Sequence, residues 1–259
     1  MVDLEKFVGM KLKLDEEKAK LVFDKDPSAI EPAVRTIAQM KEVLADESVS
    51  KPEELYYMYR DIHQSSDTDT IKKYKLRFDI TIIKPEKLDK EFMKTAGHYH
   101  PGNYPELYEV VYGEALCLQQ RFARNDPKKI EEVIVVKAKQ GQKIICLPYF
   151  GHILINLGPK PLITANWVSS EFSSEYQLYK EAKGAVYYAF DDKGTVKWEK
   201  NNYYSQIPAI KFVTSNDDMK VFGLKTGVPM YTLMGNDLAK IDFLNNPDKY
   251  EYKDAFKYA

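Results

Sequence analysis

Residues 95–115 read TAGHYHPGNYPELYEVVYGEA, and no other stretch of the chain is as informative. His98 and His100 are two positions apart, so in an extended strand both imidazoles point to the same side. Glu106 follows six positions later and opens an apolar run typical of a buried strand. Two nitrogen donors and a carboxylate at strand ends predict a site for a divalent metal ion.

A second stretch, residues 147–161, reads LPYFGHILINLGPKP and places another histidine inside a short β-like run. The chain has only 4 histidines, and three of them lie in these two strand-like stretches, which favours a shared site over chance placement. Such a mixed donor set leaves coordination positions open to a substrate, unlike a closed structural zinc site. Iron is the metal we expect, with nickel, manganese and zinc as alternatives. The predicted metal ligands are His98, His100, Glu106 and His152.

The strand pattern predicts a mainly β fold. From residue 49 to residue 207, short β-branched and aromatic runs alternate with turns rich in Gly, Pro and Asp, which is typical of a sandwich or barrel. Upstream, residues 27–47 carry apolar residues at helical spacing, which predicts an amphipathic helix within an N-terminal segment, 1–48. We expect residues 208–259 to form a C-terminal extension packed on the barrel.

Composition excludes several classes of function. Lysine plus arginine number 38 against 39 aspartate plus glutamate, so no basic surface for nucleic acid is expected. No run approaches the roughly 20 apolar residues that cross a bilayer, and the first residues lack the apolar core of a signal peptide. We therefore expect a cytoplasmic protein with no membrane partner. Cys117 and Cys146 lie in apolar runs, which favours buried thiols over a disulfide or metal ligands.

The two histidine stretches resemble the paired motifs of cupins, whose fold is a double-stranded β-helix, or jelly roll. Within the cupins, TAGHYH, the following ELY and the later PYFGH are similar to the TxGHxH, ExY and PYxxH motifs of archaeal cupin-type glucose-6-phosphate isomerases. The resemblance covers roughly residues 50–200. The matching positions of the two cupin motifs are His98, His100, Glu106 and Gly113, then Gly141, Pro148, His152 and Asn156.

This resemblance implies a sugar-phosphate substrate, a homodimer, and interconversion of glucose 6-phosphate and fructose 6-phosphate. It implies that the phosphate is held by Thr81, Thr95 and Gly97, because hydroxyls and backbone N–H groups can bind an anion without a lysine. It also implies that Tyr56, Tyr108 and Tyr149 line the sugar pocket. The expected catalytic residues are Glu106 and Tyr149. The alternative is that the threonines reflect strand propensity and the tyrosines pack in the core.

Two positions depart from the family pattern. The family usually carries a histidine where this chain has Ser174, although the nearby Tyr176 is kept, and it often has a tyrosine where this chain has Val168. Three alternatives therefore stay open: an isomerase of another sugar phosphate such as mannose 6-phosphate, a cupin that binds a metal or sugar without turnover, and a dioxygenase. The choice between a cis-enediol route, with Glu106 as base, and a hydride shift also stays open.

Overall fold

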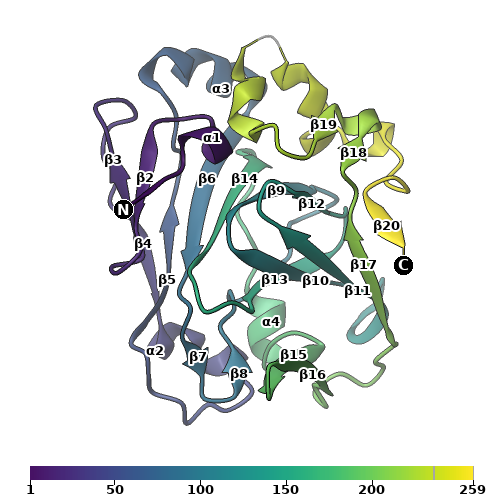
Figure 1. The fold of residues 1–259 in the computed structure, drawn as a ribbon. Helices are drawn as coiled ribbons and strands as arrows, with labels where there is room; N and C mark the ends of the chain where they lie inside the picture. The colour runs from purple at the N-terminus through teal and green to yellow at the C-terminus, as the bar shows by residue number, and fades with distance from the viewer. Residues whose placement is uncertain (236, 259) are drawn as a thin grey trace.

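Two sheets form the body of the protein, as the short strand runs predict (Figure 1). The computed structural model describes residues 1–235 and 237–258. The larger sheet has 6 strands, in the spatial order β12 (Lys143–Cys146), β9 (Glu106–Tyr112), β14 (Leu162–Ser169), β6 (Leu76–Ile83), β5 (Glu54–Tyr59) and β4 (Ala33–Thr36). The second sheet has 5, in the order β13 (Gly151–Asn156), β10 (Glu114–Ala123), β11 (Asp126–Lys139), β17 (Ile210–Ser215) and β20 (Phe256–Tyr258).

Side chains between the sheets close them into a barrel. The amide of Gln119, on β10, donates to the carbonyl oxygen of Ile145 at 3.0 Å and accepts the N–H of Leu147 at 2.9 Å. Beside it, the sulfur atoms of Cys117 and Cys146 lie 3.7 Å apart as buried free thiols. The mainly β cupin barrel expected from the sequence is confirmed.

The strands of the larger sheet are covered on both faces. On β6, Phe78 and Ile80 are buried on the outer face, and the Phe78 ring packs 4.8 Å from that of Trp167. Arg77 and Thr81 alternate with them and line a cavity inside the barrel. This period-two alternation places every second residue of the strand at the site described below.

The N-terminal segment covers the outer side of β5 with β1 (Val2–Asp3), α1 (Glu5–Val8), β2 (Leu12–Asp15) and β3 (Lys20–Phe23). Tyr59 accepts the N–H of Leu21 at 3.0 Å, and the ring of Phe23 lies 5.8 Å from its ring. Tyr59 therefore faces outward, and Tyr56, an odd number of positions away, faces the inside of the barrel.

The prediction of an amphipathic helix over residues 27–47 is wrong. Only one helical turn forms there, α2 (Ile37–Met40), followed by a 3₁₀ turn, while residues 33–36 are strand β4. Pro27 and Pro32 interrupt any long helix. The free edge of β5 also offers backbone hydrogen bonds, which residues 33–36 take up as an antiparallel neighbour. Three residues of the predicted apolar face are nevertheless buried: Ile37, Met40 and Val43.

The predicted C-terminal extension contributes strands to the barrel itself. β17 pairs with β11 in the one parallel ladder of the two main sheets, and β20 pairs with β17. Short 3₁₀ helices follow among the described residues, in yellow-green in Figure 1: Lys220–Phe222, Met230–Met234, Leu238–Leu244 and Pro247–Lys249. The second of them includes the partner of Trp167, whose indole N–H donates to the carbonyl oxygen of Met230 at 3.2 Å. Within the described residues, none of the helices has the length and apolar character needed to cross a membrane.

A small sheet completes the other end of the molecule. Its order is β16 (Thr195–Lys200), β15 (Tyr187–Asp192), β8 (Glu91–Phe92) and β7 (Lys87–Leu88). The chain leaves β8 through residues 93–105, which carry the first histidine stretch to β9 and the inside of the barrel. Nearby lies α4 (Gln177–Glu181), which supplies Tyr179 to the core beneath that stretch.

Candidate metal centre

The two histidine stretches meet because their backbones pair. His98 and His152 form an isolated antiparallel bridge, in which each N–H donates to the carbonyl oxygen of the other at 3.3 and 3.0 Å. His152 belongs to β13 and Glu106 opens β9, so the bridge brings donors from both sheets together. The ligand atoms of four residues lie within 4.8 Å of one another, and we refer to this set as the ligand cluster: His98, His100, Glu106 and His152.

Glu106 Oε2 lies at the centre of the ligand cluster. The Nε2 atom of His152 is 3.1 Å away, that of His100 is 3.3 Å away and that of His98 is 3.6 Å away. The oxygen is buried and has no hydrogen-bond partner among the described residues. A buried carboxylate oxygen normally has a partner. Three nitrogens and one oxygen converging on one point fit a divalent cation.

The protonation states also suit a cation. Burial and the neighbouring His152 lower the pKa of His98 to about 3, and burial lowers the pKa of His152. Burial alone would raise the pKa of Glu106, but the adjacent His100, His152 and His98 bring it well below its usual value. Near neutral pH His98 and His152 are therefore neutral and Glu106 is ionised, the states in which these side chains bind metals.

Contacts around the ligand cluster orient the imidazole of His100. Its Nδ1 lies 2.9 Å from the carbonyl oxygen of Tyr104, so this nitrogen carries the proton and Nε2 presents its lone pair to the cluster. Phe172 packs on the same ring, with the centroids 4.4 Å apart. The hydroxyl of Tyr108 lies 3.4 Å from Nε2 of His152. These contacts fix the orientation of the donor atoms.

The ligand cluster opens into a cavity of about 240 Å³, which we refer to as the inner cavity. Its walls come from the inward positions of β5, β6, β9 and β14 and from the loops around residues 95–100 and 172–176. Five of the residues predicted from the sequence to contact substrate line this cavity, and Tyr149 does not. The five are Tyr56, Thr81, Thr95, Gly97 and Tyr108.

Hydroxyl groups at one end of the inner cavity are already partly engaged. The Tyr56 hydroxyl accepts the N–H of Ala96 at 3.1 Å and the Nε–H of Arg35 at 3.2 Å. Thr95 Oγ1 accepts the N–H of Leu154 at 3.0 Å. Each hydroxyl keeps its own hydrogen to donate to a ligand.

Gly97 is required by the packing around it. Its φ is +80°, and a Cβ on it would lie 2.6 Å from both Ile153 and Tyr179. Any other residue would force those side chains to move.

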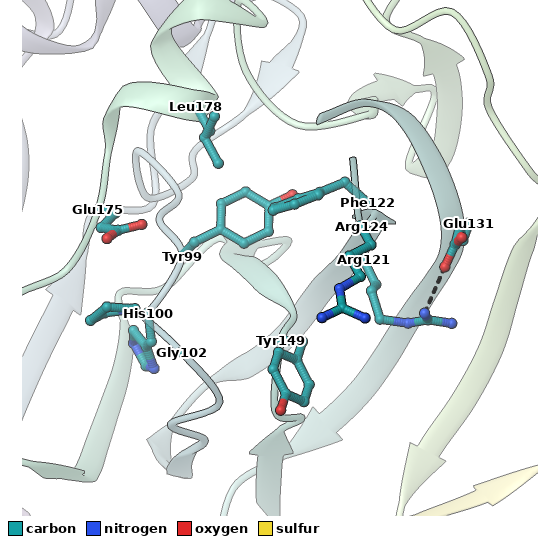
Figure 2. Close-up of a pocket in the computed structure, with 11 residues that line it drawn as sticks. Tyr99, His100, Gly102, Arg121, Phe122, Arg124, Glu131, Tyr149, Glu175 and Leu178 are labelled. Atoms are coloured by element: carbon teal, nitrogen blue, oxygen red, sulfur yellow. Dashed lines mark hydrogen bonds and ion pairs between the residues drawn. The ribbon is translucent and has the colours of Figure 1, made fainter. Parts of the chain in front are cut away.

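The prediction that Tyr149 lines the same pocket as the other substrate-binding residues is wrong. Tyr149 does not line the inner cavity; it is 58% exposed and lies in a neighbouring surface pocket with Arg121 and Arg124 (Figure 2). The cause is local, because Tyr149 has a φ of +67° in the turn before β13, and this turn directs its side chain away from the ligand cluster. The two pockets share His100 in their walls.

Two charged residues of the inner cavity were not predicted, Arg60 and Arg77. Both contact the buried carboxylate of Asp79. A signal for one of them was present in the run RFDIT, because Arg77 and Asp79 share the inward face of β6 with Thr81. Arg60 follows β5, and nothing in the sequence indicates that it turns inward.

A jelly-roll barrel with three histidines and one glutamate converging on one point is a cupin with a candidate metal centre. Residues 34–206 match the family described as glucose-6-phosphate isomerase, and the chain belongs to this family, in its cupin type. It is 26% identical over 170 residues to the glucose-6-phosphate isomerase of Thermococcus onnurineus, covering 63% of this chain and 82% of the relative. The Pyrococcus abyssi glucose-6-phosphate isomerase is 28% identical over 170 residues, with 63% and 83% covered.

Solved structures resemble parts of the chain. Oxalate decarboxylase from Bacillus subtilis aligns with a TM-score of 0.33 at 14% identity, covering 46% of this chain and 26% of its own. Vicilin from Corylus avellana aligns with a TM-score of 0.36 at 14% identity, covering 48% of this chain and 33% of its own.

Proposed function

We propose that the chain is a metal-dependent aldose–ketose isomerase that interconverts glucose 6-phosphate and fructose 6-phosphate in glycolysis or gluconeogenesis. The observation that carries the proposal is the ligand cluster at the wall of the inner cavity, in a chain of the glucose-6-phosphate isomerase family. The cavity combines neutral donors, one carboxylate and several hydroxyls, which suits a polar sugar.

The reaction moves a hydrogen between C1 and C2 and builds negative charge on the two adjacent oxygens. A divalent ion held by the ligand cluster, which we expect to be iron, with nickel, manganese or zinc as alternatives, would stabilise that charge electrostatically. The hydroxyl of Tyr108 lies beside the ligand cluster and can donate to a sugar oxygen. The displaced Tyr149 has no role in this scheme.

The role of Glu106 differs between the two possible chemical routes. It is the one carboxylate among the described residues that line the inner cavity, so in a cis-enediol route it takes the proton from one carbon and returns it to the other. In a hydride shift no base is needed, and Glu106 acts only as a ligand. Incorporation of solvent deuterium at C1 or C2 during turnover supports the enediol route, and its absence supports the shift.

The test of the proposed function is conversion of fructose 6-phosphate to glucose 6-phosphate by purified protein loaded in turn with Fe²⁺, Ni²⁺, Mn²⁺ and Zn²⁺. We expect turnover with at least one metal and none after chelation. A protein that binds metal yet converts no sugar phosphate would be a binding cupin, and the proposal would be wrong. Oxygen consumption without isomerisation would indicate a dioxygenase instead.

Mannose 6-phosphate is a second candidate substrate because two lining positions differ from the family pattern. Val168 and Ser174 both line the inner cavity, where the family often has tyrosine and usually has histidine. Smaller side chains there remove contacts to sugar hydroxyls, the groups that distinguish epimers. The ratio of kcat/KM for the two hexose 6-phosphates separates the candidates.

We also propose that the protein acts as a homodimer in the cytoplasm. The support for the dimer is the resemblance to cupin isomerases, together with exposed edge strands such as β20, where Tyr258 is 67% exposed. Light scattering on the eluting peak of a gel-filtration column measures the mass directly: about twice 30.0 kDa is expected, and 30.0 kDa would contradict the dimer.

A further inference from the structure

Arg60 and Arg77 line the inner cavity and share one carboxylate that lies behind them. Asp79 Oδ2 lies 2.9 Å from an Nη of Arg60 and 2.8 Å from an Nη of Arg77. The Nε–H of Arg77 also donates to both Asp79 oxygens, at 2.9 and 3.0 Å. The Asp79 side chain is 3% exposed, whereas those of Arg60 and Arg77 are 43% and 30% exposed. The carboxylate is thus the buried support, and the guanidinium groups remain open to the cavity.

The three side chains together carry one net positive charge. One arginine would balance the carboxylate, which also accepts the N–H of Asp61 at 2.9 Å. Each guanidinium has five N–H groups, and contacts to Asp79 and to the sulfur of Met58 occupy only part of them. Donors with a fixed positive charge are therefore left over for a group inside the cavity.

Strand pairing places Arg77 level with the ligand cluster. Val168 of β14 pairs with Arg77 of β6 on one side and with Glu106 of β9 on the other. Because neighbouring strands are about 4.8 Å apart, the Cα atoms of Arg77 and Glu106 are separated by about 10 Å. Both side chains line the inner cavity, and the small Val168 side chain lies between them. Arg77 and the ligand cluster therefore enclose the same part of the cavity from two sides.

Arg60 belongs to the same part of the cavity. Its partner Asp79 pairs with Asn166 of β14, and Asn166 pairs with Tyr108, the tyrosine beside the ligand cluster. Burial alone would lower the pKa of Arg60, but the ion pair with Asp79 raises it above its usual value, and the ionised Glu106 adds to that rise. Arg60 thus stays charged and lies close enough to the ligand cluster for the two to interact electrostatically.

The hydroxyls expected to hold the phosphate lie further along β6. Thr81 is four positions beyond Arg77 on the same face of the strand, which is a separation of about 13 Å. Tyr56, on the neighbouring β5, accepts the N–H of Ala96, so residues 95–97 also lie at this end. A sugar phosphate with its phosphate there extends along the cavity until its other end lies between the ligand cluster and the arginines.

From these observations we propose that Arg60 and Arg77, held by Asp79, donate hydrogen bonds to the substrate oxygens at the reacting end, opposite the ligand cluster. The inference rests on the proposed isomerase function and leaves the phosphate at Thr81 and residues 95–97. As hydrogen moves between C1 and C2, negative charge builds on the two adjacent oxygens. Fixed positive charge beside those oxygens stabilises the transition state more than the bound substrate, so the arginines raise kcat.

The first test is steady-state kinetics on fructose 6-phosphate with the metal-loaded full chain. Arg60→Gln and Arg77→Gln should each lower kcat by about 100-fold, while KM and calorimetric binding of inorganic phosphate change by less than about threefold. Thr81→Val should do the reverse, with weaker phosphate binding and a raised KM. Arg124→Gln, which changes an exposed arginine of the neighbouring pocket, is the matched control and should leave all three values unchanged.

Metal content and Arg77→Lys separate this role from a merely structural one. The lysine keeps a positive charge beside Asp79 but loses the fork geometry, so this variant should fold, keep its metal and retain more of kcat than Arg77→Gln. Unchanged kcat in both glutamine variants would overturn the proposal. So would weaker phosphate binding and a raised KM in those variants with kcat unaffected.

A stable charged analogue provides a second measurement that needs no turnover. Arabinonate 5-phosphate places a carboxylate close to the position of the reacting carbons, and arabinitol 5-phosphate is its neutral counterpart at that end. The parent protein should bind the acid more tightly than the alcohol, and Arg60→Gln and Arg77→Gln should each reduce this preference by about 10-fold, because each removes a charge-assisted hydrogen bond. If the glutamine variants do not fold, Arg77→Lys takes their place, and an unchanged preference together with an unchanged kcat overturns the proposal.

Failure of this inference is distinguishable from failure of the proposed function. Turnover of fructose 6-phosphate with unchanged kcat and unchanged preference for the acid in Arg60→Gln and Arg77→Gln would keep the isomerase and remove the role of the arginines. A preference for the acid that depends on both arginines, without turnover of either hexose phosphate, would keep the arginine contacts and remove the isomerase.

Discussion

Glu106 is the residue on which the geometry places the strongest constraint. Its Oε2 is buried, lacks a hydrogen-bond partner among the described residues, and lies 3.1–3.6 Å from three imidazole nitrogens. An ionised carboxylate in that position is stable only with positive charge beside it. The geometry therefore suits the proposed ligand role, whereas the proposed role as a base depends on the reaction route.

Glu106→Gln separates the two roles. The amide is neutral and a poorer donor to a cation, so we expect metal affinity to fall at least about 10-fold, with activity lost in parallel. Metal content after dialysis and isomerase activity are the two measurements. Glu131→Gln, which changes an exposed carboxylate of the neighbouring pocket, serves as the control. Full metal content with no activity would instead show that Glu106 acts as the base.

Gly97 provides a second test at the scale of one residue. Gly97→Ala places a methyl group 2.6 Å from Ile153 and Tyr179 at a positive φ, and should lower the free energy of unfolding by about 2–4 kcal/mol. Gly102→Ala shares the positive φ but meets nothing within 4 Å, so only about 1 kcal/mol is expected. Urea denaturation measures both. Equal losses would show that packing around Gly97 is unimportant.

At the scale of elements, a buried ion pair joins β9, β12 and the C-terminal segment. Glu109 and Lys143 lie 3.1 Å apart with side chains 2% and 3% exposed. Glu109 also accepts the N–H of Met230 at 2.7 Å, and Lys143 donates to the carbonyl oxygen of Lys225 at 2.8 Å. The pair thus binds residues 225–230 to the sheet edge through one hydrogen bond from each partner.

Breaking this pair should be costly. Glu109→Gln leaves the Lys143 ammonium group buried without its counter-charge, and we expect a loss of about 3–5 kcal/mol in unfolding free energy. Glu114→Gln breaks the exposed pair between Glu114 and Lys137 and should cost less than about 1 kcal/mol. Chemical denaturation distinguishes these values. A loss below about 1 kcal/mol for both would mean that the buried pair does not hold the segment.

At the scale of the whole molecule, the described residues after position 207 complete the barrel. They add β17 and β20 to the second sheet and cover Trp167 on the outer face of the first. A chain ending at residue 207 would expose the edge of β11 and that outer face to water, which removes much of the buried apolar area. We therefore expect the truncated chain to lose its near-ultraviolet circular dichroism and cooperative melting.

Trp167→Phe provides the matched comparison for the truncation. It removes the hydrogen bond to Met230 and part of the buried ring that packs on Phe78 and Tyr231, so about 2–3 kcal/mol of stability should be lost and the fold kept. A truncated chain with native circular dichroism and cooperative melting would show that the extension is merely attached to the barrel.

The sequence by itself determined the strand class and the ligand cluster. Period-two alternation and turn residues reflect local backbone geometry, and the HxH pair shares a face for the same local reason. His98 and His152 are 54 positions apart in the chain, so their meeting was predicted from their places in two strand-like runs and supported by the resemblance to cupins.

The tertiary structure alone decided three other features. Residues 33–36 became a strand because the edge of β5 supplied hydrogen-bond partners that the local helical spacing could not reveal. Tyr149 lies outside the inner cavity because its turn has a positive φ. Arg60 lines the cavity because it forms an ion pair with Asp79 on the neighbouring strand. The first and the third outcome depend on contacts between residues distant in sequence, which exist only once the sheets have formed, and the second depends on a local backbone conformation that the residue types of the turn do not reveal.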